Sequence, residues 1–252
     1  MINKIIHRFQ LLLIYEIVFM LISVATFAQD SILNKYGLWV IKDINQLQKT
    51  IDNNAGKAMI DIKKAIPGIQ LDLRYAGTNN FMHEKLYPPI RTTYLRKDAT
   101  DKLIQVQAEL MKNHLGLKVF DAYRPYSVTE RLWEPVQDDR YAADPKKGSG
   151  HNRGIAVDLT IISLQTKKEL DMGTGFDNFS DTAHHAFKNL PDTVLQNRNL
   201  LQSIMEKYGF IALETEWWHY YLPNSNLYEL LDVSFKKLAK LNKQKYVSTK
   251  PK

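Results

Sequence analysis

The 252-residue sequence contains no cysteine. This absence excludes disulfide bonds, zinc sites built from thiolates, and cysteine nucleophiles. It leaves the compartment open, because an oxidising space permits disulfides without requiring them. Internal repeats are also lacking, and low complexity is confined to the lysine-rich C-terminal end. With 44% hydrophobic and 24% charged residues, a chain of this length is typical of one globular domain with a sizeable core.

The formal net charge of +7 comes from the C-terminal end of the chain, which contains lysines and no acidic residue. Residues 1–28 contribute +1, and the seven lysines after Phe235 contribute +7 with no acid among them. Residues 29–235 therefore carry a net charge of −1. A nearly neutral body with a basic tail is a poor footprint for nucleic acid, which we exclude as a partner. No feature of the sequence predicts a stable protein partner.

The one long apolar run, residues 11–24, follows Lys4 and Arg8 near the N-terminus. A basic start, an apolar run and a small residue, here Ala28, are the features of a secretory signal. We therefore expect cleavage after Ala28 and an exported, periplasmic protein. Glu16 interrupts the run and argues against a permanent span, since an acidic side chain at the bilayer centre costs about 2.5–3.5 kcal/mol. An uncleaved membrane anchor is the alternative.

Apolar periodicity predicts an α+β fold, an antiparallel sheet flanked by helices. Helices are expected over 97–113, 127–135 and 197–208, and strands over 61–75, 115–122, 155–161 and 210–222. Ser127 followed by Glu130 predicts a capping box at the start of the second helix. We divide the chain into a signal peptide (1–28), an N-terminal extension (29–59), a main domain (60–235) and a lysine-rich tail (236–252).

Two distant segments carry candidate metal ligands. His151 and Asp158 lie in the first, and the second is Glu216-Trp-Trp-His219. Two imidazoles and a carboxylate are ligands that zinc accepts, and three protein ligands leave one tetrahedral position open, as in catalytic sites. Glu216 is close enough to His219 to act as a general base. Residues three apart in a straight strand point to opposite faces. Glu216 and His219 can therefore face one ion only if a bulge intervenes or Glu216 belongs to the preceding turn.

These ligands and three further segments resemble the VanX-type D-alanyl-D-alanine dipeptidases, a family of zinc peptidases. The further segments are Leu71–Ala76 followed by Asn80-Phe81, Phe120–Pro125 and Leu170–Asp177. The resemblance covers about residues 60–221. It implies the zinc peptidase fold shared with the hedgehog signalling domain, one Zn²⁺ per chain, and hydrolysis of the dipeptide D-alanyl-D-alanine to two D-alanines. Outside the cytoplasm this activity suits cell-wall peptide turnover better than depletion of a cytoplasmic precursor pool.

The resemblance also assigns roles to individual residues. Arg124 would stabilise the oxyanion that develops on the scissile carbonyl, although it could instead be a structural arginine paired with Asp121. Asp177 and Tyr75 would hold the free amino group of the substrate. Ser149 matches a position near the substrate, but a serine in a loop is also a common turn former.

The sequence departs from the family pattern at a few positions. Gly150 and Asn152 flank His151 where small hydroxyl residues are expected, and the lysine-rich tail has no counterpart. His184 and His185 resemble the family but lie outside the ligand set, and we interpret them as structural. Trp217 and Trp218, between Glu216 and His219, are interpreted as core and cleft wall.

Two other functions remain open. A carboxypeptidase or endopeptidase of the same superfamily could use these ligands on longer peptidoglycan peptides, but Asp177 favours a substrate with a free amine. A non-catalytic zinc-binding protein could recognise wall peptides or a partner protein. Such a protein would need neither Glu216 nor Arg124, so their presence argues against it.

Overall fold

The computed structural model describes residues 33–248, with side chains as far as Lys243. The predicted signal peptide lies outside the described residues. From Val40 onward the chain forms one compact unit, and the described residues before it, 33–39, cluster separately. In this short stretch the side chain of Asn34 accepts the backbone N–H groups of Tyr36 and Leu38 and closes a turn. None of the helices within 33–248 is long and apolar enough to span a membrane.

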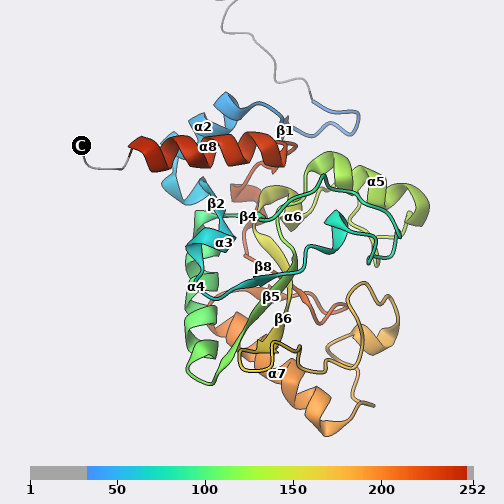
Figure 1. Cartoon of the computed structure of the whole chain (residues 1–252). Helices are drawn as coiled ribbons and strands as arrows, with labels where there is room; N and C mark the ends of the chain where they lie inside the picture. Colours follow the sequence, from blue (N-terminus) through green and yellow to red (C-terminus); the bar gives the residue numbers. More distant parts are fainter. Residues whose placement is uncertain (1–32, 249–252) are drawn as a thin grey trace, which may run out of the picture. The chain divides into compact units, whose positions relative to one another are not determined.

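Helices and short strands alternate along the unit that starts at Val40 (Figure 1). The helices are α2 (Ile44–Asn53), α3 (Ile62–Ala65), α4 (Lys97–Met111), α5 (Tyr126–Val136), α6 (Gly150–Arg153), α7 (Asp192–Lys207) and α8 (Phe235–Ser248). The strands are β1 (Val40–Ile41), β2 (Met59–Asp61), β3 (Gln70–Leu71), β4 (Tyr94–Arg96), β5 (Leu115–Asp121), β6 (Ala156–Ser163), β7 (Ile211–Ala212), β8 (His219–Tyr221) and β9 (Leu230–Leu231).

A five-stranded sheet in the order β3-β5-β6-β8-β7 is the centre of the fold. Every pair in it is antiparallel except β3 with β5, which run parallel at one edge. Two small two-stranded sheets, β1-β9 and β2-β4, lie beside it. The α+β fold expected from periodicity is confirmed, with the parallel edge strand as its one departure from a fully antiparallel sheet.

The register of this sheet brings polar residues together from three strands. Asp121 of β5 lies opposite Asp158 of β6, and Asp158 lies opposite His219 of β8. Residues directly opposite one another project from the same face of a sheet. A shift in register between Val119 and Asp121 marks a bulge in β5, and bulges re-aim side chains locally. The sheet thus collects residues that are distant in sequence on one face.

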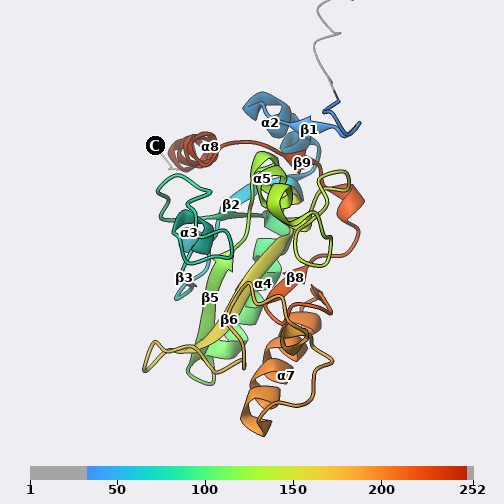
Figure 2. The same cartoon turned by 90° about the vertical axis from the view of Figure 1, so that its right-hand side faces the viewer.

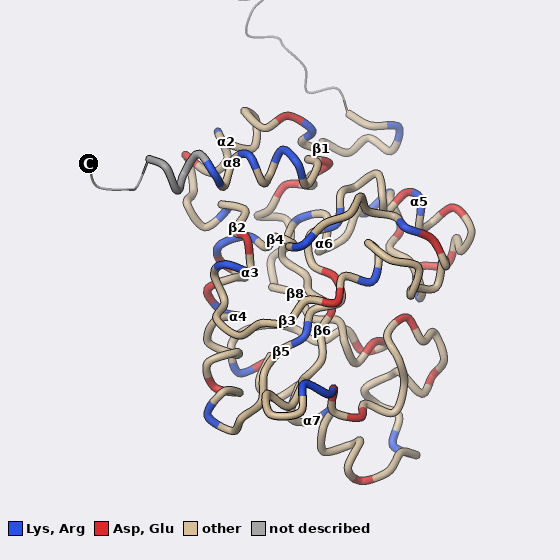
Figure 3. Tube along the Cα trace, viewed as in Figure 1, with Lys and Arg blue, Asp and Glu red and all other residues tan. Residues whose placement is uncertain are grey.

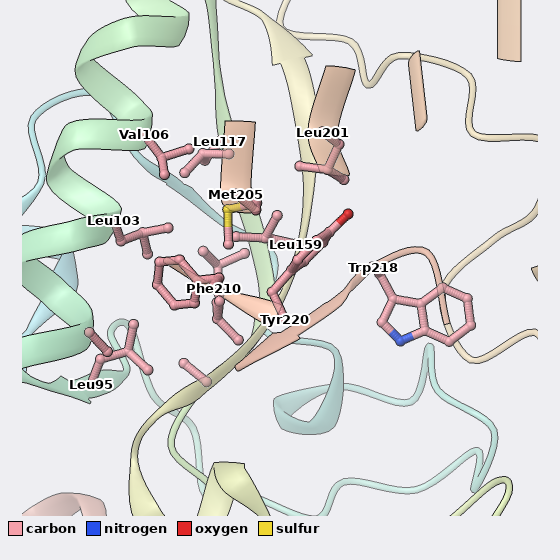
Figure 4. Packing of buried hydrophobic residues seen from close by; sticks show 14 of the residues in the cluster. Leu95, Leu103, Val106, Leu117, Leu159, Leu201, Met205, Phe210, Trp218 and Tyr220 are labelled. Atoms are coloured by element: carbon pink, nitrogen blue, oxygen red, sulfur yellow. The ribbon is translucent and has the colours of Figure 1, made fainter. Parts of the chain in front are cut away.

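The main core lies between the sheet, α4 and α7, with α4 packed along β5 and α7 beside β7. Figure 4 shows side chains of both helices meeting those of the strands; labelled members include Leu103, Val106, Leu117, Leu159, Leu201 and Met205. Each fully buried side chain of this kind contributes about 1.5–3 kcal/mol. Trp218 stands at the edge of the group in Figure 4, toward the face that carries the polar residues.

A second apolar cluster lies under α2 and α8, which run side by side in Figures 1 and 2. Leu47 and Ile51 of α2 are buried in it together with Leu238 of α8. Residues that we assigned to an N-terminal extension and to a basic tail therefore contribute to the core of the unit that starts at Val40.

The predicted strand over 61–75 is wrong. The carboxylate of Asp61 instead accepts the backbone N–H of Lys64 and caps α3, which ends before a turn at Gly68, where φ is +80°. Within this range only Asp61, the last residue of β2, and Gln70–Leu71 pair as strand residues, and a 3₁₀ turn follows at Arg74–Ala76. The alternating apolar residues are buried, but they belong to several short elements.

The predicted helices over 97–113, 127–135 and 197–208 exist, with corrected boundaries for all three; α4 ends at Met111, two residues earlier than predicted. The capping box at Ser127 is wrong, because α5 begins one residue earlier, after Pro125. The hydroxyl of Ser127 donates to Asp232 Oδ1 at 2.7 Å and ties the helix to the segment after β9. α7 starts at Asp192, five residues earlier than predicted, behind Pro191, which is well suited to the start of a helix.

Candidate metal and substrate site

His151 lies on the one-turn helix α6, directly before β6. Ser149 caps this helix, because its Oγ accepts the N–H of Asn152 at 3.2 Å while the Asn152 side chain accepts the N–H of Ser149 at 3.0 Å. Gly154 ends the helix with φ +71°, a conformation that favours glycine. The short helix fixes the direction of the His151 side chain.

The two departures from the family pattern beside His151 have structural reasons. A Cβ at position 150 would lie 2.8 Å from the Cβ of Ala156, so the close approach of α6 to β6 requires glycine. Asn152 is fully buried, and its amide donates to the carbonyl of Arg124 at 2.9 Å and to Thr129 Oγ1 at 2.8 Å. Asn152 thereby links the helix that carries His151 to the segment that carries Arg124.

Glu216 and His219 face the same site because the chain turns between them. Glu216 lies in the turn that connects β7 to β8, where its N–H donates to Leu213 O and its carbonyl accepts the N–H of His219. Of the two arrangements that the sequence left open, the structure has the turn. The Glu216 Oε2 atom lies 3.8 Å from His219 Nδ1.

His151, Asp158 and His219 converge with a geometry that fits a tetrahedral zinc ion. One ligand atom from each lies within 4.8 Å of the other two. His151 Nε2 is 3.2 Å from His219 Nδ1 and 3.4 Å from Asp158 Oδ2, and His219 Nδ1 is 2.9 Å from Asp158 Oδ1. Ligands about 2.0–2.1 Å from a tetrahedral ion would lie roughly 3.3 Å from one another. The donor set and its spacing therefore suit zinc.

The surroundings hold these three side chains in place. His151 Nδ1 donates to the carbonyl of Ala122 at 2.7 Å, which leaves Nε2 facing the site, as is usual for a histidine ligand. Burial opposes the charge on Asp158, but His151 and His219 hold the pKa of this carboxyl well below its usual range. The carboxylate is therefore ionised and ready to bind a cation.

Arg124 pairs with Asp121, so the structural partner that the sequence suggested is present. Its guanidinium donates to Asp121 Oδ2 from Nε at 3.0 Å and lies 3.8 Å from Asp158 Oδ2. Asp121 is fully buried and also accepts a hydrogen bond from Tyr87 at 2.8 Å. Arg124 nevertheless lines the cavity and stacks 5.0 Å from the ring of Tyr75. Pairing with Asp121 holds the guanidinium at the site without covering it.

Asp177 lies at the other end of the cavity with only neutral donors around it. The Tyr75 hydroxyl donates to Oδ1 at 3.2 Å, and the backbone N–H of Phe81 donates to Oδ2 at 3.3 Å. Burial, assisted by the negative charge of Asp158, raises the pKa of Asp177 to about 8. Within residues 33–248 no basic side chain forms an ion pair with it. This carboxyl is therefore suited to a cationic ligand.

Glu216 is similarly perturbed. Burial raises its pKa to about 7, with the charge of His219 lowering it and that of Asp158 raising it again. A carboxyl that titrates near neutral pH can both accept and return a proton, which is the property of a general base.

A cavity of about 190 Å³ contains all eight residues that the sequence singled out as metal, catalytic or substrate-binding residues: Tyr75, Arg124, Ser149, His151, Asp158, Asp177, Glu216 and His219. Three aromatic residues also line it, of which only Phe81 belongs to a segment that the sequence singled out. Phe179 packs 5.1 Å from Phe81 and 5.0 Å from Tyr141, so three separate segments meet there. Tyr87, beneath Arg124, was also missed, because nothing in the local sequence links it to Asp121.

The neighbouring histidines and tryptophans lie outside the ligand set. His184 and His185 are in the loop before α7, where His185 packs beside Tyr220. Trp217 is buried and donates to Thr174 Oγ1 at 2.8 Å, which anchors the loop that leads to Asp177. Trp218 forms part of the cavity wall and packs against Phe176.

Comparison with known proteins gives consistent results. Residues 55–240 match the model of a family described as D-ala-D-ala dipeptidase. A D-alanyl-D-alanine dipeptidase of Escherichia coli (strain K12) is 34% identical over 177 residues, which cover 70% of this chain and 91% of that protein. One from Enterococcus faecium is 30% identical over 191 residues, covering 65% of this chain and 93% of that protein. A solved structure of the LdcB LD-carboxypeptidase is a more distant likeness, with 18% identity, a TM-score of 0.39, and 75% and 73% of the two chains covered.

Proposed function

Because the chain belongs to the D-ala-D-ala dipeptidase family of metallopeptidases, we propose that it hydrolyses D-alanyl-D-alanine to two D-alanines, with one zinc ion held by His151, Asp158 and His219. The spacing of these three side chains supports the metal. When bound, zinc supplies Lewis-acid chemistry, polarising the peptide carbonyl and lowering the pKa of water from 15.7 to about 7.

The residues around the proposed metal site transfer the proton, stabilise the developing charge and position the substrate. Glu216 takes a proton from the attacking water and returns it to the amine that leaves when the peptide bond breaks. Its pKa of about 7 supports both transfers. Arg124, held by Asp121, donates to the carbonyl oxygen as negative charge develops there. Ser149 lines the cavity beside them but also caps α6, so we assign it to positioning of α6 and of the substrate.

The observation that carries the dipeptidase proposal is the unpaired Asp177. The ammonium of a substrate can pair with this buried carboxyl group, which has no basic partner. The Tyr75 hydroxyl already donates a hydrogen bond to one of its oxygens. An ammonium in that position requires a free amino group next to the scissile bond. This requirement favours a dipeptide over the blocked or longer peptides that a carboxypeptidase or endopeptidase would cleave.

Comparing free and blocked dipeptides tests this proposal. N-acetyl-D-alanyl-D-alanine lacks the ammonium, and a hydrogen bond to a charged group contributes about 1.5–3 kcal/mol, with a similar cost for leaving the carboxylate unpaired. The purified protein should therefore cleave it at least about a hundredfold less efficiently than D-alanyl-D-alanine. Asp177→Ala should narrow the difference, and a chelator should abolish both activities. Preference for the acetylated peptide would indicate that the protein is a carboxypeptidase and not a dipeptidase. Zinc binding without cleavage of either would favour a recognition protein.

We further propose that the protein is exported and acts in cell-wall peptide turnover. The basic and apolar pattern of residues 1–28 supports export. N-terminal sequencing of the protein from the periplasmic fraction should begin at or near Gln29. A sequence that begins at Met1 in a membrane fraction would indicate the uncleaved anchor instead.

A further inference from the structure

The helix α8 is attached to the body by one apolar side. Phe235 and Leu238 are buried in the second apolar cluster, and Leu241 packs against it. The amide of Asn242 donates to the carbonyl of Met59 at 3.0 Å and adds a polar attachment further along the helix. These contacts determine which side of α8 faces outward.

The outward side of α8 is lined by lysines. Lys236, Lys240 and Lys243 are exposed and spaced four and three residues apart, so they lie along one face of the helix, with Lys237 beside them. α8 contains no acidic residue (Figure 3). Among the described residues, none of these four lysines forms an ion pair. The face therefore presents a row of uncompensated positive charges.

Acidic residues near the start of α8 have other partners. Asp43 accepts the backbone N–H groups of Asn45 and Gln46 and caps α2. Asp232 accepts both the N–H and the hydroxyl of Ser127. Glu229 pairs with Lys57 at 2.5 Å and with the buried Arg96 at 3.3 Å. The ion pairs compensate Glu229, whereas hydrogen bonds leave Asp43 and Asp232 charged, and the Asp43 carboxylate interacts with Lys237 at the start of the row. Lys236, Lys240 and Lys243 have no acidic partner among the described residues.

The lysine row begins close to the start of the compact unit. β1, which starts the compact unit, pairs with β9, and α8 begins four residues after β9. The Nζ of Lys237 donates to the carbonyl of Lys42, just after β1, at 3.2 Å. The family match ends within α8 at residue 240 and thus includes Lys236, Lys237 and Lys240, but not Lys243.

We propose that this basic face of α8 binds the surface of a membrane that contains anionic lipids. The apolar side of α8 packs against the protein, so only its lysine side is free to face a membrane. The interaction is therefore electrostatic and does not involve insertion of apolar side chains. Each lysine close to an anionic leaflet contributes to such binding, which is screened by salt. The near-neutral charge of residues 29–235 argues against nucleic acid as the polyanion. The face would retain the enzyme at a membrane after removal of the signal peptide.

Co-sedimentation of the processed protein with lipid vesicles tests this proposal. The protein should bind vesicles of phosphatidylcholine mixed with phosphatidylglycerol but not vesicles of phosphatidylcholine alone, and added salt should release it. Replacing Lys236, Lys237, Lys240 and Lys243 together by Gln should weaken binding by a factor on the order of 10² or more. A matched variant replaces four exposed lysines elsewhere by Gln, namely Lys85, Lys112, Lys146 and Lys168. It should bind like the unmodified protein.

Both variants should keep their metal content and their activity on the free dipeptide, which shows that they are folded and separates this proposal from the proposed reaction. Three results would each overturn it: equal binding to both kinds of vesicle, equal weakening by the two sets of substitutions, or no binding to anionic vesicles. Binding of a DNA duplex through the four α8 lysines, without binding to vesicles, would identify a nucleic acid as the partner instead.

Discussion

The two ends of the cavity differ in how their buried carboxyl groups are compensated. At the metal end, Asp158 lies 2.9 Å from His219 and 3.4 Å from His151, and its pKa is held below its usual range despite burial. At the other end, Asp177 receives hydrogen bonds only from a hydroxyl and a backbone N–H, and burial raises its pKa to about 8. Both carboxyl groups are buried, but only Asp158 has nitrogen atoms of His151, His219 and Arg124 within 4 Å.

This difference indicates which ligand each end is built for. A carboxylate within a set of close histidines is preorganised for a metal ion, which such a set binds with little rearrangement. A carboxylate buried without a cation costs free energy in the empty protein, and a cationic ligand recovers that cost on binding. Glu216, with a pKa of about 7, lines the same cavity and can both accept and release a proton near neutral pH.

The largest expected effect comes from breaking the compensated end. His219→Ala removes one of three ligands, so the variant should lose bound zinc and, with it, several kcal/mol of transition-state stabilisation, or a factor on the order of 10³ or more in kcat/KM. Metal analysis and a dipeptide assay measure both. His184→Ala, outside the ligand set, should retain zinc. Full zinc occupancy in His219→Ala would remove this residue from the site.

Glu216→Gln should have the next largest effect and should separate catalysis from metal binding. The amide cannot accept the water proton, so turnover should fall by a factor on the order of 10²–10⁴ while zinc content stays unchanged. Glu214→Gln, on the same turn but exposed, is the matched control and should be fully active. Near-normal turnover by Glu216→Gln would mean that another group acts as the base.

Asp177→Asn should have the smallest effect, and in the metal-free protein it should be stabilising. The folded-state pKa of about 8 lies above the pKa of 3.8 of an unperturbed aspartate, so unfolding releases a proton between these values and stability falls as the pH rises through that window. Asn does not ionise. The variant should therefore melt like the unmodified protein at about pH 4, and about 3 °C or more higher at about pH 8.

Thermal melts in the presence of a chelator, across that pH range, measure this difference. Asp181→Asn is the control, because the Asp181 side chain is 92% exposed and its substitution should give no pH-dependent gain. If the melting temperatures of Asp177→Asn and the unmodified protein differed by the same amount at every pH, burial would not raise the pKa of Asp177. Its proposed role in binding the substrate ammonium would then lose its main support.

Residue type and order along the chain were enough to predict the candidate ligands of the site. His151, Asp158 and His219 could be selected because zinc accepts few residue types and because their spacing resembles one family. Helix α4 was predictable for a different reason, since apolar residues at helical spacing encode one buried face. The α+β fold followed from the same periodicity. These features depend on residue type and local order along the chain.

Only the tertiary structure decided how those residues meet. The turn at Glu216 and the register that aligns Asp121, Asp158 and His219 result from strand pairing, which no local pattern specifies. The capping box at Ser127 failed because α5 begins after Pro125, and the Ser127 hydroxyl bonds instead to Asp232, 105 residues away. Local sequence expresses backbone preferences, whereas the partners of a polar side chain depend on which distant segments the apolar core brings beside it.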